Sequence, residues 1–182
     1  MTASAPSSAT TWTLDATHTL VEFAVKHLMI TTVKGRFGGV TGSITLAGDR
    51  SAATVEIDAA SIDTRVEQRD EHLRSPDFLD VANHPTLTFR SRRMEGAVAK
   101  AGDRFRLIGD LTIRGVTREV ALDTVFEGEA TDPWGGSRAS FSATTRIDRR
   151  DFGLTWNQAL EAGGVLVANE VRIALEVQAT RA

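Results

Sequence analysis

Apolar and polar residues alternate with a period of two through most of this chain, and about eight such runs follow one another. The clearest runs are residues 87–90 (LTFR), 104–107 (RFRL) and 171–177 (VRIALEV). Each run has one apolar and one polar face, and only one of these faces can be buried, as is typical of antiparallel sheets. We therefore predict an all-β, mainly antiparallel fold in which the strands close into a barrel or stack as a sandwich.

The apolar faces of these runs are rich in phenylalanine. Five of the eight phenylalanines lie in phase on five different runs: Phe23, Phe89, Phe105, Phe126 and Phe141. Aromatic residues in strands ordinarily form plain core, whereas an eight-stranded barrel is wide enough either to be filled by side chains or to hold one small ligand. Gly42 and Gly109 are in phase with the apolar face and would leave space there. A filled core and a ligand cavity both stay open.

Length and composition fit one domain without a nucleic-acid partner. The chain has 182 residues, and its 21 basic and 24 acidic residues are scattered, with a net charge of -3. This gives no broad positive surface for a phosphate backbone. The absence of cysteine removes disulfides, thiolate nucleophiles and thiolate metal ligands. Residues 1–10 lack the features of a secretory signal, so we expect a disordered leader there, a single domain over 11–182 and a cytoplasmic location.

Glycine pairs and polar clusters mark the reversals between strands, at Gly38-Gly39 for example. We expect strands from about residue 11 and then over 19–27, 36–46, 53–58, 85–94, 104–113, 116–127, 137–148 and 167–179. No apolar run approaches the ~20 residues that a membrane-spanning segment needs.

One segment departs from the alternating pattern and predicts a helix. Residues 64–67 (TRVE) match a capping box, in which a threonine and a glutamate satisfy free amide groups at a helix start. The predicted helix runs over 65–74 and is ended by Ser75-Pro76, because the residue before a proline disfavours helical geometry.

Motifs for catalysis are sparse, so we predict no enzyme and assign no catalytic residue. The chain has no serine nucleophile elbow, phosphate-binding loop or dinucleotide-binding fingerprint. Its four histidines (His18, His27, His72 and His84) lack a spacing that would place two imidazoles on one metal. Local hydrogen bonding is their simplest role, and we predict no metal site, although one assembled from distant residues stays an alternative.

Two polar clusters allow two interpretations. Residues 69–72 (RDEH) lie on the predicted helix, and residues 149–151 (RRD) follow a strand. Both clusters are charge-balanced, so they fit a solvated face with ordinary salt bridges. They equally fit a polar ring at the mouth of a cavity, where guanidinium and imidazole groups would bind an oxygen-bearing headgroup.

Several ordered segments resemble a known family. They are residues 15–27 (DATHTLVEFAVKH), 35–37 (GRF), 61–64 (SIDT), 69–73 (RDEHL), 78–80 (FLD), 109–117 (GDLTIRGVT) and 150–154 (RDFGL). Between about Trp12 and Ala179 the chain is similar to the YceI-like family of bacterial polyisoprenoid-binding proteins. One departure is Ala168-Asn169, where we expect a Gly-Asp pair from the family.

The resemblance implies a lipocalin-like, extended eight-stranded β-barrel with one inserted α-helix near an opening. It implies a bound polyisoprenoid or isoprenoid quinone as ligand, no other cofactor, no catalysis, and a possible homodimer. Exported family members carry signal peptides, and we find none in residues 1–10.

The in-phase large residues are the candidate lining of the tunnel. They are Phe23, Val25, Phe37, Ile44, Val55, Ile57, Leu87, Phe89, Phe105, Leu107, Leu111, Leu122, Phe126, Phe141, Ile147, Trp156, Leu160, Val171, Ile173 and Leu175. Candidate headgroup contacts are His27, Arg69, His72, Arg150 and Asn157.

Three hypotheses for function follow. The first is binding, storage or transport of a long-chain isoprenoid or related amphiphile. The second is an enzyme that acts on an amphiphile in the same cavity, with His72 and Asp70, or Arg150 and Asp151, as acid and base. The third is a packed, stress-associated structural domain without a ligand.

Overall fold

The computed structural model describes residues 9–48 and 50–181. Its strands are β1 (Thr10–Leu14), β2 (Leu20–His27), β3 (Thr31–Phe37), β4 (Val40–Leu46), β5 (Ala52–Asp58), β6 (Ile62–Asp63), β7 (Thr86–Glu95), β8 (Arg104–Ile113), β9 (Val116–Thr131), β10 (Ser137–Asp148) and β11 (Val167–Arg181). Its helices are α1 (Glu67–Arg74) and the short 3-10 helices η1 (Ala16–His18), η2 (Ala59–Ser61) and η3 (Arg149–Phe152).

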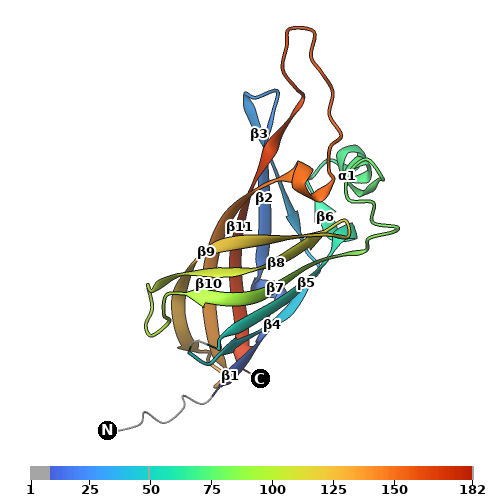
Figure 1. The fold of residues 1–182 in the computed structure, drawn as a ribbon. Helices are drawn as coiled ribbons and strands as arrows, with labels where there is room; N and C mark the ends of the chain where they lie inside the picture. The colour runs from blue at the N-terminus through green and yellow to red at the C-terminus, as the bar shows by residue number, and fades with distance from the viewer. Residues whose placement is uncertain (1–8, 49, 182) are drawn as a thin grey trace.

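The strands form a closed antiparallel barrel. β1 and β2 pair with opposite ends of β11, while β4 pairs with β1 and β3 with β2. β1 and β2 therefore act as one long strand that is interrupted once, and β3 and β4 act as a second. With β5, β7, β8, β9, β10 and β11 they complete a ring of eight. The predicted eight-stranded barrel with one inserted helix is confirmed. β1 and the C-terminus lie at one end of the barrel, and α1 lies at the other (Figure 1).

Most predicted strands are found, with one clear correction. The strand predicted over 36–46 is two strands, because Gly38-Gly39 interrupts it between β3 and β4. The first half of β3 was not predicted, since the segment 31–35 (TTVKG) has a single large apolar residue and so alternates weakly. The predicted leader over 1–10 lies outside the described residues apart from Ala9 and Thr10, where β1 begins.

The helix ends as predicted but begins later. α1 starts at Glu67 instead of Arg65, and no side chain caps its first turn. The capping box does not form, because the hydroxyl and the amide of Thr64 both donate to the Asp70 carboxylate. Asp70 thus ties the preceding segment to the helix. The helix stops before Ser75, in agreement with the proline that follows.

The end of the barrel that holds β1 is filled by side chains. We call it the packed end and define it by its buried residues Trp12, Phe105, Phe126, Ala139, Phe141 and Ala179. The rings of Phe126 and Phe141 lie side by side, with centroids 5.2 Å apart. Burial of a large apolar side chain contributes about 1.5 to 3 kcal/mol, so this cluster is a main source of stability.

Ion pairs tie the loops together beside the packed end. Arg138 Nη1 lies 2.9 Å from Asp15 Oδ2, and Arg138 Nε lies 3.0 Å from Asp132 Oδ2. Hydrogen bonds from Thr17, His18 and Arg138 hold the pKa of Asp15 far below its ordinary value. The Gly136 amide and Arg138 likewise lower the pKa of Asp132.

These carboxylates predict an acid-dependent loss of stability. A lowered folded-state pKa stabilises the fold above the unfolded-state pKa of about 3.9, and this contribution is lost as the pH falls. Asp15→Asn should therefore destabilise the protein most at neutral pH, and its difference from wild type should shrink below about pH 4. Urea unfolding between pH 7 and pH 2 measures this difference. An equal difference at all pH values would contradict the prediction.

Candidate functional site

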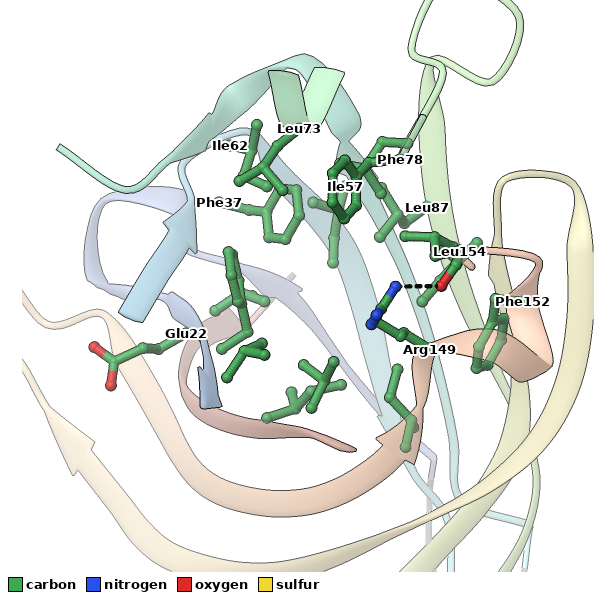
Figure 2. A pocket seen from close by; sticks show the side chains of 18 of the residues that line it. Glu22, Phe37, Ile57, Ile62, Leu73, Phe78, Leu87, Arg149, Phe152 and Leu154 are labelled. Atoms are coloured by element: carbon green, nitrogen blue, oxygen red, sulfur yellow. Dashed lines mark hydrogen bonds between the residues drawn. The ribbon is translucent and has the colours of Figure 1, made fainter. Parts of the chain in front are cut away.

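The part of the barrel that faces α1 is hollow. It encloses a cavity of about 430 Å³, which lies in the range of small-molecule sites of about 300 to 1,000 Å³. The wall consists of inward-facing residues of the strands, and residues of α1, of η3 and of their following loops complete it. Figure 2 shows apolar side chains from these elements, including Phe37, Ile57 and Leu87, gathered around the space.

Most residues predicted to line a tunnel lie in this wall. They are Phe23, Val25, Phe37, Val55, Ile57, Leu87, Phe89, Leu111, Leu122, Ile147, Trp156, Val171, Ile173 and Leu175. Those on strands alternate with outward-facing neighbours, so the period of two placed them on the inner face. Their contact with a ligand stays a prediction.

The other predicted lining residues lie elsewhere. Phe105, Phe126 and Phe141 belong to the packed end, where neighbouring side chains fill the interior. The remaining corrections are Ile44, Leu107 and Leu160. Ile44, paired with Trp12, and Leu107 pack against the core, and Leu160 lies in the loop 153–166, bonded through its backbone to Gly164. A period of two tells inside from outside but does not tell depth along the barrel.

Several wall residues were missed because they lie outside regular strands. They include Ile62 in the two-residue β6, Leu73 on α1, and residues of loops and η3: Phe78, Leu79, Phe152 and Leu154. No alternation marks such positions. Their one signal is that all six belong to the segments 61–64, 69–73, 78–80 and 150–154, which carry the family resemblance.

The in-phase glycines do not supply the empty space. A Cβ at Gly109 would lie 2.4 Å from the carbonyl oxygen of Arg90 and 2.7 Å from the ring of Phe89. A Cβ at Gly42 would lie 2.2 Å from the carbonyl oxygen of Thr54. Both positions are glycine because backbone or a ring already occupies the site of a side chain, which corrects the expectation from sequence.

Polar residues gather where α1 meets the cavity. The ring of His72 lies edge-on to Trp156 and Phe78, at centroid distances of 4.7 and 5.1 Å, and its Nε2 lies 2.9 Å from Asp77 Oδ2. Arg69 donates to the hydroxyl and the carbonyl of Thr64, at 2.7 and 2.9 Å. His27, Arg69 and His72 thus border the cavity, as a headgroup site would require.

Two predicted headgroup residues do not border the cavity. Arg150 turns outward and pairs with Asp148 on the surface. The Asn157 amide donates to the carbonyl of Val167 at 2.7 Å and accepts from its N–H at 3.0 Å. Asn157 therefore fastens the loop 153–166 to the start of β11. In both cases a nearer partner holds the side chain.

The pairs considered for acid–base catalysis are not formed. Asp70 is buried, 3% exposed, and bonds to Thr64, while His72 bonds to Asp77. Arg150 pairs with Asp148 instead of Asp151. Among residues 9–48 and 50–181, no group of three or more histidine, aspartate or glutamate side chains could hold a metal ion.

Arg149 is a buried guanidinium in the cavity wall, and the sequence did not single it out as a contact. Its side chain is 5% exposed, and Figure 2 shows it extending into the space between the apolar side chains. It donates to the carbonyls of Ala168 (2.9 Å), Leu154 (2.7 Å) and Trp156 (2.8 Å), and weakly to Val167 (3.4 Å) and to Asn169 Oδ1 (3.5 Å). Burial lowers the pKa of Arg149.

The YceI-like domain family matches residues 12–179, which is nearly the whole chain. The chain belongs to the YceI-like family. A UPF0312 protein of Yersinia pestis (strain Pestoides F) is 41% identical to this YceI-like chain over 141 residues, 76% of this chain and 71% of the relative. A UPF0312 protein of Vibrio cholerae is 37% identical over 140 residues, 75% of this chain and 72% of the relative.

Solved structures share the fold of this YceI-like chain. The Campylobacter jejuni YceI protein superposes with a TM-score of 0.71 at 28% identity and covers 85% of this chain and 88% of its own. Burkholderia cenocepacia BcnA has a TM-score of 0.77 at 21% identity, with coverage of 91% and 98%. A polyisoprenoid binding domain from Saccharophagus degradans has a TM-score of 0.72 at 16% identity, with coverage of 94% and 98%. In the described part of the chain, no helix has the length and apolar character to cross a membrane.

Proposed function

We propose that this chain binds a long-chain isoprenoid, of polyprenyl or quinone type, in the hollow part of its barrel and stores or transports it. The observation that carries the proposal is the apolar cavity between the packed end and α1. Its apolar wall suits a hydrocarbon tail, and the polar residues where α1 meets the cavity suit the headgroup of a ligand whose tail is buried. The name of the Saccharophagus degradans domain, a polyisoprenoid binding domain, supports this ligand class.

The hydrophobic effect is large enough for such binding. A buried methylene contributes about 0.8 kcal/mol, so each five-carbon isoprene unit contributes roughly 3 to 4 kcal/mol before the cost of ordering the chain. The tightest non-covalent complexes have binding free energies of about -20 kcal/mol. For a long tail, the cost of ordering and incomplete burial must therefore offset much of the gain. We therefore expect tail length and fit to control affinity more than polar contacts do.

The other two functions have less support. Catalysis would need a titratable pair that faces the cavity, and the two candidate pairs are each bonded elsewhere. A ligand-free structural domain would need a filled interior, whereas only the packed end is filled. The cytoplasmic location and the homodimer stay predictions.

The direct experiment is to identify a bound molecule. Native mass spectrometry and organic extraction of the purified protein should yield a co-purifying isoprenoid, or the stripped protein should take up added geranylgeraniol. Protein that is empty when purified and that also ignores geranylgeraniol and longer polyprenols would contradict the proposal.

A pair of substitutions tests where the tail lies. Ile173→Trp enlarges a half-buried wall residue and should reduce the amount of polyprenol bound while leaving the melting temperature nearly unchanged. Phe141→Trp enlarges a ring in the packed end, where overpacking typically costs about 1 to 3 kcal/mol, and should leave uptake unchanged. Thermal melting and a binding titration measure both. The reverse pattern would mean that the tail does not lie in this cavity.

A further inference from the structure

The charges that line the cavity are unbalanced. Apart from histidines, the charged residues in the wall are Glu22, Lys26, Arg69 and Arg149. The Glu22 carboxylate lies 3.1 Å from the Lys34 ammonium, and Figure 2 shows it pointing away from the other lining side chains. Lys26 is exposed on the same outward face of β2 as Glu22, so the charges that remain toward the cavity are those of Arg69 and Arg149.

Arg149 is the buried cation of the cavity wall, and no carboxylate of the residues that the structure describes pairs with it. Within residues 9–48 and 50–181, no carboxylate oxygen lies within 4.0 Å of its guanidinium nitrogens. The nearest acid in sequence, Asp148, pairs with Arg150 on the outer surface. Carbonyl and amide oxygens satisfy the Arg149 donors but do not neutralise their charge. A buried ion without a counterion is unfavourable, so a ligand anion placed there would gain more than it would at an exposed arginine.

The hydrogen bonds of Arg149 leave one nitrogen weakly held. The bonds from Nε and Nη1 measure 2.7 to 2.9 Å, whereas those from Nη2 to Val167 and Asn169 measure 3.4 and 3.5 Å. Ordinary N–H···O bonds are 2.7 to 3.2 Å long. A ligand oxygen could therefore take a short bond from Nη2 at little cost, while Nε and Nη1 keep the side chain in place.

We infer that the cavity selects amphiphiles with an anionic head, a carboxylate or a phosphate monoester, and that Arg149 Nη2 donates to that head. This inference rests on the proposed function, because it assumes that an oily tail occupies the same cavity. Hydrogen bonds to charged groups are about twice as strong as neutral ones, so the head would discriminate among ligands whose tails are alike.

The test compares ligands that differ only in the head. Farnesyl phosphate against farnesol, and oleate against oleyl alcohol, should each show a preference of roughly tenfold or more for the anion in a binding titration, since a charge-assisted bond has about that effect. The two pairs also distinguish phosphate from carboxylate. Equal affinities within both pairs would overturn the inference and leave the proposed function standing. Failure of all four ligands and of geranylgeraniol to bind would remove the proposed function itself.

Asn169→Asp is the decisive variant, because it changes charge with almost no change in shape. Its carboxylate would lie beside Arg149 Nη2, where the amide oxygen now lies at 3.5 Å, and would neutralise the guanidinium. We expect about tenfold weaker binding of farnesyl phosphate and unchanged binding of farnesol. Gln178→Glu adds the same charge on β11 near the packed end and is the matched control, expected to change neither. An unchanged preference for the anion in Asn169→Asp would overturn the inference.

Discussion

Replacing Phe141 by alanine should lower the free energy of unfolding by about 3 to 5 kcal/mol, the range for removing a phenylalanine from a tight core. The ring is 5% exposed and lies against Phe126 in the packed end. Because the surrounding strands are hydrogen-bonded on both sides, the barrel cannot collapse into the space that the ring leaves. Chemical unfolding monitored by circular dichroism measures the change.

Phe23→Ala is the matched comparison for this prediction. Phe23 is also an aromatic residue on an inward face, but it is half-buried and borders the cavity. Its removal enlarges a space that already exists instead of opening a new one, so we expect a loss at least about 1 kcal/mol smaller. Equal losses at the two positions would mean that the barrel is packed evenly along its length.

Replacing Arg149 by methionine should destabilise the protein by about 3 kcal/mol or more, because it leaves several buried carbonyl groups without a donor at about 1 to 3 kcal/mol each. Two of these carbonyls, of Leu154 and Trp156, lie in the loop 153–166, and that of Ala168 lies just after it in β11. The same substitution should therefore expose this loop to proteolysis. Chemical unfolding and limited digestion with mapping of the cleavage sites measure the two effects.

Arg150→Met is the control for Arg149→Met, since the two arginines are neighbours with opposite environments. Arg150 forms a surface ion pair with Asp148, and such pairs contribute about 0 to 1 kcal/mol. The control should keep both its stability and its resistance to proteolysis. Comparable losses in the two variants would show that the carbonyl contacts of Arg149 do not hold the loop.

The strands were predictable wherever alternation was strong. β8 and β10 begin and end at the predicted residues, because their apolar face is buried and their polar face is solvated. β3 was half missed for the opposite reason, since its first residues are mostly polar. The helix start was misplaced because Thr64 has a stronger tertiary partner in Asp70 than in a capping box.

The sequence predicted which residues face the interior of the barrel but not how far the cavity extends along it. Phe89 and Phe141 are equally in phase, yet the first borders the cavity and the second fills the packed end. What separates them is the height along the barrel, which depends on strand register and tilt that no local pattern encodes. Arg149 was grouped with Arg150 as one polar cluster, because two adjacent arginines look alike until the backbone turns one of them inward.

The packed end has a consequence for how a ligand enters and leaves the barrel. Because Trp12 and its neighbours close this end, a long-chain ligand would enter tail first and leave head first through the same opening. The depth above the packed end limits the tail that the cavity can hold: a tail that fits inside leaves the head beside Arg149, whereas a longer tail would keep the head beyond the opening and away from Arg149. The exposed part of a longer ligand is then accessible to an acceptor, so we expect transfer to that acceptor to become easier as the tail lengthens.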